Sequence, residues 1–159
     1  MKRYIIIGLT ALLCACTSQK KTPTQSQSAD KDPGVGDTRT YTVESLDDNT
    51  YLLTEATTDK TYGYTKENPI KTGGSKEKSG PMNERRFLNA LLGPGGESIG
   101  YFRAGSCCGF KTPNGLMNNM GLLDIYRIWW QGSKDTVSLY INMYDKGDLY
   151  IPAGFTARK

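Results

Sequence analysis

The segment TVSLYINMY, residues 136–144, carries the clearest two-residue repeat in the chain. Every second residue of this segment is a large apolar one: Val137, Leu139, Ile141 and Met143. Because successive side chains of a strand point to opposite faces of a sheet, the alternation predicts a strand with one buried face. The apolar segment 122–130 precedes it, and residues 131–135 between the two are few enough for a hairpin loop. We therefore expect an antiparallel pair of strands.

An earlier segment of the chain has the pattern of a helix. Residues 84–92, ERRFLNALL, place three apolar side chains on one stripe at helical spacing: Phe87, Leu88 and Leu91. Asn83 can cap the first turn, and Gly93 followed by proline can end the helix. A helix of about two to three turns is unstable alone, so we expect its stripe to pack against the sheet.

Other short apolar or alternating segments predict the remaining strands: residues 39–46, 51–55, 61–65, 99–104 and 149–152. The glycine- and lysine-rich segment 71–81 is expected to be a surface loop. One short helix and several strands joined by short connections predict an α+β domain. We expect a small, mostly antiparallel sheet or an open barrel with the helix packed on it, in a single domain at residues 38–159.

The first residues have the features of a signal peptide. Lys2 and Arg3 provide positive charge, and residues 4–13 are almost entirely apolar. Ten helical residues rise only about 15 Å, half the hydrocarbon thickness of a bilayer. This segment is therefore too short for a stable membrane span.

Residues 13–16, LCAC, resemble the lipobox of bacterial lipoproteins. The resemblance implies removal of residues 1–15 as a signal peptide and acylation of Cys16, with palmitate among the fatty acids expected. Acylation at Cys14 would put a leucine directly before the cleavage site, where the lipobox has a small residue. The remaining alternatives are ordinary secretory cleavage and a short buried helix.

Residues 16–37 are expected to be a lipidated cysteine followed by a flexible tether. The segment is rich in serine, threonine and glutamine and has no aromatic residue, so it cannot bury enough apolar surface to offset its ordering entropy. Thr17, directly after Cys16, is not the aspartate that retains lipoproteins in the inner membrane of some bacteria. We expect a lipid-anchored cell-envelope protein on the periplasmic face of the outer membrane.

The composition argues against several kinds of catalytic and binding site. The chain has no histidine, so catalytic triads and metal sites that depend on imidazole lose their usual residue. Removing Lys2 and Arg3 from the 20 basic residues leaves 18 against 16 acidic ones, and no basic stripe remains for nucleic acid. We expect no metal, no cofactor and no nucleic-acid partner.

Cys107 and Cys108 are the most reactive residue types of the predicted domain. Adjacent Cα atoms lie about 3.8 Å apart, below the separation that disulfides prefer, so a bridge between them needs a turn. Gly105 and Gly109 make such a turn feasible. Three states remain open: two packed free thiols, a vicinal disulfide that shapes a loop, or a reactive redox or metal-binding pair.

Arg85 and Arg86 lie in the first turn of the predicted helix, where the helix dipole disfavours cations, and such places can mark anion sites. Tyr62 and Tyr64 belong to a larger set of aromatic residues that could line a groove for a glycan or a peptide. These four are the candidate ligand-binding residues. The alternatives are exposed arginines paired with acidic side chains, and tyrosines packed in the core.

Several segments together resemble a family of small bacterial envelope lipoproteins: YGYTKENPIKTGG (62–74), NERRFLNALLGPGGE (83–97), GSCCGFKTPNG (105–115), GLLD (121–124) and IPAGF (151–155). Members of that family often carry the label 2-dehydro-3-deoxyphosphooctonate aldolase. The genuine synthase resembles a (β/α)₈ barrel, which needs roughly 200–250 residues and a repeating strand–helix pattern. The domain expected here is about half that long, with one convincing helix.

These observations favour a lipid-anchored envelope lipoprotein without catalytic activity, with an interaction or structural role. A first alternative is a module that binds an anionic or glycan ligand through Arg85 and Arg86. A second alternative is an enzyme, either the labelled aldolase or a thiol-redox protein acting through Cys107 and Cys108. The expected partners are the membrane, through the lipid anchor, and an envelope protein or glycan.

Overall fold

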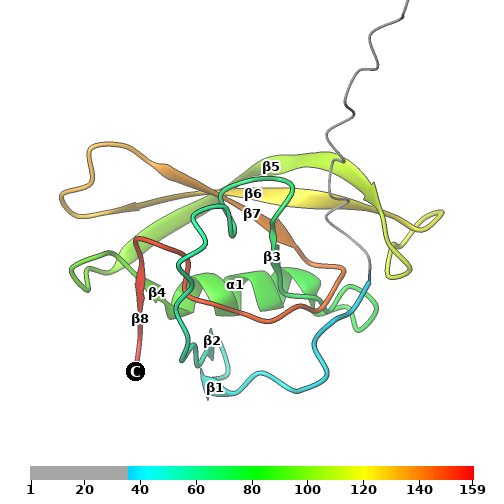
Figure 1. Ribbon diagram of the computed structural model, residues 1–159, viewed down its shortest axis with the longest axis horizontal. Helices are drawn as coiled ribbons and strands as arrows, with labels where there is room; N and C mark the ends of the chain where they lie inside the picture. Colours follow the sequence, from blue (N-terminus) through cyan, green and yellow to red (C-terminus); the bar gives the residue numbers. More distant parts are fainter. Residues whose placement is uncertain (1–35) are drawn as a thin grey trace, which may run out of the picture.

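The computed structural model describes residues 36–159 (Figure 1). The predicted signal peptide, Cys16 and the tether as far as residue 35 lie outside the described residues. Within the described part, no helix is long and apolar enough to cross a membrane.

A four-stranded sheet forms one layer of the domain. Its strand order is β3–β7–β6–β5, with β3 at Ile70–Lys71, β5 at Ile99–Lys111, β6 at Met120–Trp130 and β7 at Val137–Asn142. Strands β5, β6 and β7 are antiparallel neighbours, which confirms the predicted hairpin across residues 131–135. Within this sheet, β3 pairs in parallel with β7, with Ile70 opposite Ile141.

The one helix of the described residues, α1 at Gly80–Ala90, lies across one face of this sheet (Figure 1). We call this the inner face of the sheet. Two smaller antiparallel sheets complete the fold: β1 at Ser45–Asp47 with β2 at Thr50–Tyr51, and β4 at Leu91–Leu92 with β8 at Thr156–Ala157. The architecture is the predicted α+β fold, a mostly antiparallel sheet with one short helix and no closed barrel.

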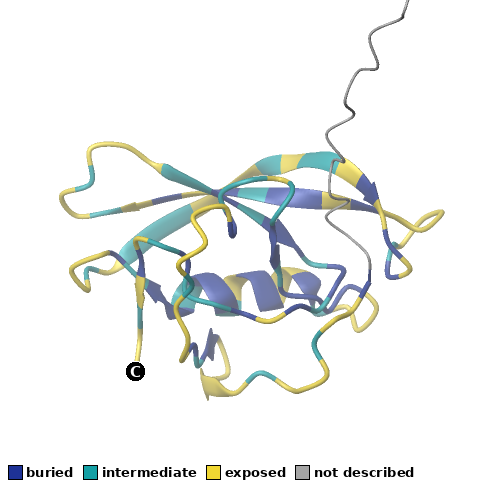
Figure 2. Ribbon diagram, viewed as in Figure 1, coloured by how far each residue is buried: buried dark blue, intermediate teal, exposed yellow. Residues whose placement is uncertain are grey.

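The core lies between α1 and the inner face (Figure 2). The predicted helical stripe is fully buried, as are the inward-facing residues of the central strands: Phe87, Leu88, Leu91, Ile128, Leu139 and Ile141. Burying each such side chain contributes roughly 1.5–3 kcal/mol. The two-residue period of β6 then puts Asp124 and Tyr126 on the same face as Ile128, so polar groups enter the layer that α1 covers.

The helix begins earlier than predicted. It starts at Gly80 with a proline in its first turn, and its N-cap position is Ser79. Asn83 is not the cap, because its Nδ2 instead donates to the carbonyl oxygen of Gly73 at 3.0 Å. That contact also corrects the surface-loop prediction, since residues 72–75 are buried beneath the start of α1.

Several predicted strands were wrong or misplaced. Residues 61–65 form turns, because the backbone N–H and hydroxyl of Thr61 both donate to Asp59 and the N–H of Tyr64 donates back to Thr61. Residues 39–44 form no strand, and 149–152 contribute a single bridge at Ile151. Strand β5 extends to Lys111, seven residues beyond the predicted end, with two irregularities in its pairing to β6.

Candidate functional site

A cavity opens between the start of α1 and strands β5 and β6. Its volume is about 460 Å³, within the range of small-molecule sites. Residues of α1, of strands β5 and β6, and one methionine after β7 line it: Pro81, Glu84, Arg85, Tyr101, Phe102, Arg103, Asp124, Tyr126 and Met143. We refer to this space as the Glu84 cavity.

Glu84 is the unusual residue of this cavity. Its side chain is fully buried although it carries a carboxyl group. The hydroxyl of Tyr126 donates to Oε2 at 2.9 Å, whereas Oε1 receives no hydrogen bond from any donor in the described part of the chain. The pKa of Glu84 is raised to about 8, mainly by burial of its carboxyl group and secondly by the nearby negative charge of Asp124.

Asp124 is held by a second set of polar groups. The guanidinium of Arg103 donates to both of its carboxylate oxygens, from Nε to Oδ2 and from Nη2 to Oδ1, each at 2.7 Å. The Ser106 hydroxyl donates to Oδ1 at 2.8 Å. This two-pronged arrangement is the strong form of an arginine–carboxylate pair, and it compensates the charge of the nearly buried Asp124.

Glu84 keeps its proton near neutral pH. At pH 7 the neutral form of Glu84 predominates, because its pKa of about 8 lies above that pH. The nearby negative charge of Asp124 also favours this neutral form. The cavity thus combines the neutral carboxyl group of Glu84 on α1 with a carboxylate, a hydroxyl and a guanidinium on β5 and β6. A ligand with several polar groups can exchange hydrogen bonds with them.

The two predicted arginines separate. Arg85 is exposed and lines the Glu84 cavity. Arg86 turns toward the β1–β2 turn, where its Nε donates to the carbonyl oxygen of Asp48 at 2.8 Å and its Nη1 donates to Asn83 at 3.2 Å. One arginine of the pair therefore remains available to a ligand, and the other connects the helix to a neighbouring loop.

The two predicted tyrosines lie away from this cavity. Tyr62 is buried, its hydroxyl donates to the carbonyl oxygen of Asp148 at 3.3 Å, and it accepts from the N–H of Tyr150 at 3.1 Å. Burial raises the pKa of Tyr62. The Tyr64 hydroxyl donates to the carbonyl oxygen of Ala153. Both tyrosines hold the carboxy-terminal segment in place, so the four candidate ligand-binding residues do not form one site.

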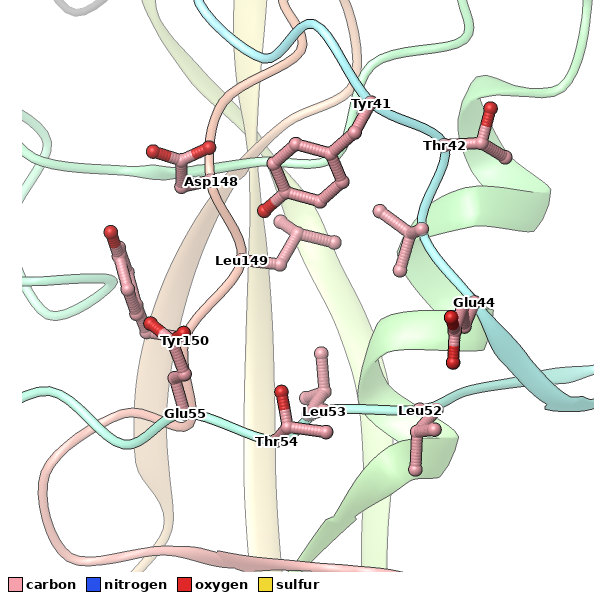
Figure 3. Close-up of a pocket in the computed structure, with 11 residues that line it drawn as sticks. Tyr41, Thr42, Glu44, Leu52, Leu53, Thr54, Glu55, Asp148, Leu149 and Tyr150 are labelled. Atoms are coloured by element: carbon pink, nitrogen blue, oxygen red, sulfur yellow. The ribbon is translucent and has the colours of Figure 1, made fainter.

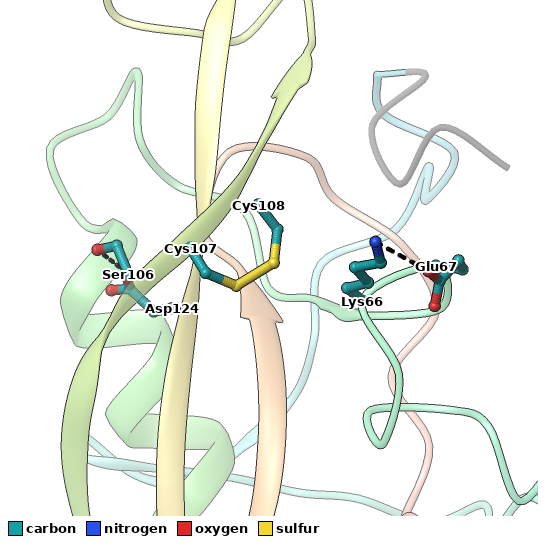
Figure 4. Close-up of a disulfide and its surroundings, with 6 residues drawn as sticks. All are labelled: Lys66, Glu67, Ser106, Cys107, Cys108 and Asp124. Atoms are coloured by element: carbon teal, nitrogen blue, oxygen red, sulfur yellow. Dashed lines mark hydrogen bonds and ion pairs between the residues drawn. A yellow bond between two sulfur atoms is a disulfide. The ribbon is translucent and has the colours of Figure 1, made fainter. Parts of the chain in front are cut away.

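Cys107 and Cys108 form a vicinal disulfide on β5, the second of the three states left open by the sequence (Figure 4). Cys108 adopts a positive φ of 57°, and the pairing of β5 with β6 is irregular between Cys107 and Phe110. The bridge packs against the buried side chain of Leu123. It directly follows Ser106, so it fixes the backbone next to a residue that holds Asp124.

A second hollow lies on another side of the domain (Figure 3). It has a volume of about 520 Å³ and is bordered by three acidic side chains, Glu44, Glu55 and Asp148, together with Tyr41 and Tyr150. Burial and the charge of Asp148 raise the pKa of Tyr41. Among the lining residues no basic side chain balances these acids. No cluster in the described residues has the histidine, cysteine and carboxylate ligands of a metal site.

The Glu84 cavity is the stronger candidate, and the sequence contained signals for it. Glu84 precedes Phe87 and Leu88 by three and four residues, so it lies on the apolar stripe of the helix. Asp124 shares the two-residue period of Tyr126 within a mostly apolar strand. A charged residue at a position that a pattern assigns to the core is a signal of a built site.

No protein-family model, curated protein or solved structure matches this chain.

Proposed function

We propose that this chain is a lipid-anchored lipoprotein of the cell envelope whose domain binds a small carboxylated sugar in the Glu84 cavity. The observation that carries the proposal is the fully buried carboxyl group of Glu84, with a raised pKa and one oxygen that receives no hydrogen bond from the described residues. Leaving a buried polar atom without a partner costs about 1–3 kcal/mol. A site that keeps such a group in an open cavity is suited to a ligand that supplies the partner.

The lining favours a ligand that is both hydroxylated and anionic. Glu84, Asp124 and Tyr126 offer acceptors and donors for hydroxyl groups, in the pattern that sugars use. The ring of Tyr101 provides an apolar wall for a sugar face. Arg85 adds an uncompensated positive charge at the rim, which a carboxylate of the ligand can neutralise.

The lipid anchor is proposed from the lipobox-like residues 13–16. Acylation of Cys16 would hold the domain at the outer membrane, facing the periplasm. Carboxylated sugars are components of bacterial cell envelopes, so the proposed location and the proposed ligand agree. The role is binding, through which the lipoprotein interacts with an envelope glycan.

Titration with N-acetylmuramic acid and with glucuronic acid tests the proposal, with glucose as the neutral comparison. We expect the acidic sugars to shift the amide resonances of Glu84, Arg103 and Asp124, and glucose to shift them much less. Arg85→Ala should weaken binding by about tenfold, because one charge-assisted hydrogen bond is lost.

Arg86→Ala is the matched control, since Arg86 is adjacent in the helix but faces the β1–β2 turn. It should leave the affinity for the acidic sugars unchanged. Equal losses of affinity in the two variants, or no shift with either acidic sugar, would overturn the assignment of this cavity.

A further inference from the structure

Four large apolar side chains are exposed around the turn between β5 and β6. Leu116 is 66% exposed, Met117 77%, Met120 42% and Leu122 48%, and we call these four residues the apolar tip. Met117 and Met120 form an antiparallel bridge, and Met120 and Leu122 both border Gly109. The residues are therefore neighbours, and contiguous exposed apolar surface of this kind marks an interaction site.

The charge around the tip points to a lipid surface. Between residues 107 and 123, Lys111 is the one charged residue of the sequence. The loop that carries the tip thus brings no carboxylate of its own into contact with a bilayer, and the exposed Asp37 beside it is hydrogen-bonded to Asn114 at the base of the tip. Lys111 lies where anionic lipid headgroups attract it. Leucine and methionine are side chains that partition into the boundary between headgroups and acyl chains.

The described chain begins beside this tip. Gly36 lies against the ring of Pro113, and a Cβ atom on Gly36 would lie 3.1 Å from the Pro113 Cγ atom. Asp37 accepts a hydrogen bond from Nδ2 of Asn114 at 2.7 Å. Cys16 is about twenty residues before Gly36, and this length of chain spans at most about 70 Å. A lipid on Cys16 would therefore keep this end of the domain close to the membrane.

Buried hydrogen bonds make the base of the tip rigid. The fully buried carboxylate of Asp145 accepts from the Thr112 hydroxyl, and from Nδ2 of Asn114 and of Asn142 at 3.0 Å each. The N–H of Thr112 donates to the carbonyl oxygen of Asn119 at 2.9 Å, closing the turn. The tip and the start of the described chain are thus fixed to the end of β7 in one orientation.

We propose that the apolar tip inserts into the surface of the same membrane that holds the acylated Cys16. The inference rests on the lipid anchor of the proposed function. The anchor supplies proximity, and the tip sets the orientation of the domain, with the β6–β7 loop at the far end of the sheet pointing away from the lipid (Figure 1).

Quenching by lipids with a doxyl group tests this orientation in the mature chain, reconstituted in phosphatidylethanolamine–phosphatidylglycerol vesicles. A fluorescent label is placed on Met117→Cys or, as the matched control, on Lys134→Cys in the β6–β7 loop. Cys107 and Cys108 are bonded to each other, so the new thiol is labelled selectively. We expect quenching at position 117 at least about threefold stronger than at 134. Adding Leu116→Gln and Met120→Gln to the Met117→Cys variant should lower the quenching at position 117 to that at position 134.

A second sample separates this inference from the lipid anchor. Residue 16 is changed by Cys16→Ser, and an amino-terminal oligohistidine tag holds the chain to nickel-chelating lipids. Stronger quenching at 117 in this sample supports tip insertion even if mass spectrometry finds no acyl group on Cys16. Equal quenching at 117 and 134 in both samples would overturn it, whatever the state of Cys16.

Discussion

The hydroxyl of Tyr126 on β6 donates a 2.9 Å hydrogen bond to Oε2 of Glu84 on α1, inside the layer between helix and sheet. This bond is the polar connection between the two elements that enclose the proposed site. Both residues are buried and both line the cavity, so the bond belongs to the packing of α1 on the sheet and to the proposed site.

The stability of the domain should fall as pH rises from about 5 to 8, because the folded protein holds a proton on Glu84 over this range. Its pKa is raised in the folded state to about 8, so above pH 5 the unfolded chain has already lost a proton that the folded chain keeps. The free energy of unfolding should then drop by up to about 1.4 kcal/mol per pH unit and level off above pH 8.

Glu84→Gln should abolish this dependence of unfolding free energy on pH. Glu67→Gln, which removes a carboxylate at the surface, should preserve it. Urea denaturation at a series of pH values measures the difference. An unchanged slope in Glu84→Gln would show that Glu84 titrates alike in both states.

Tyr126→Phe removes the donor to Glu84 while keeping the ring in the core. Since the hydrogen bond from Tyr126 lowers the pKa of Glu84, its loss should raise that pKa further. The unfolding free energy should fall by about 1–3 kcal/mol, because a buried acceptor loses its partner. Tyr140→Phe, on β7 and packed in the other hydrophobic cluster, serves as the comparison. Equal stability of Tyr126→Phe and the parent protein would contradict the assigned contact.

The vicinal disulfide predicts the thiol content of the mature protein. Counting thiols under denaturing, non-reducing conditions should find none at Cys107 and Cys108, and two after reduction. Reduction should also shift the amide resonances of Ser106 and Asp124, because Ser106 directly precedes the bridge and bonds Asp124. Two free thiols in the unreduced protein, or reduction without any shift at these residues, would argue against this structural role.

Leu88→Ala should be strongly destabilising. Leu88 is fully buried between α1 and the sheet, and truncation of such a side chain costs about 2–5 kcal/mol. Met82→Ala on the same helix removes a 43% exposed side chain and should change stability by less than about 0.5 kcal/mol. Thermal and urea unfolding of the two variants compare the costs directly, and similar losses would mean that the predicted stripe is not the core face.

The sequence predicted those parts of the fold that a strong period defines. The apolar segment 122–130 and the two-residue repeat of 136–144 predicted β6, β7 and their hairpin. The stripe of Phe87, Leu88 and Leu91 predicted the buried face of α1. Short segments failed where tertiary contacts determine the backbone. Residues 61–65 have the composition of a strand, but the Asp59 side chain ties them into turns.

The candidate site was predicted only in part. Arg85 was identified as a ligand-binding residue and does line the cavity, whereas Tyr62 and Tyr64 hold the carboxy-terminal segment. Glu84 and Asp124 were missed because each lies on its own element, and periodicity does not show that two faces meet. That pairing depends on the register of α1 against β6, which no local pattern encodes.

The most direct test of the proposed site is the titration of the Glu84 side-chain carboxyl carbon by NMR, with and without N-acetylmuramic acid. We predict a pKa near 8 in the free protein and a clear change in that pKa when the sugar occupies the cavity. A Glu84 resonance that titrates at its ordinary value near 4.5, and does not respond to the sugar, would contradict the assignment.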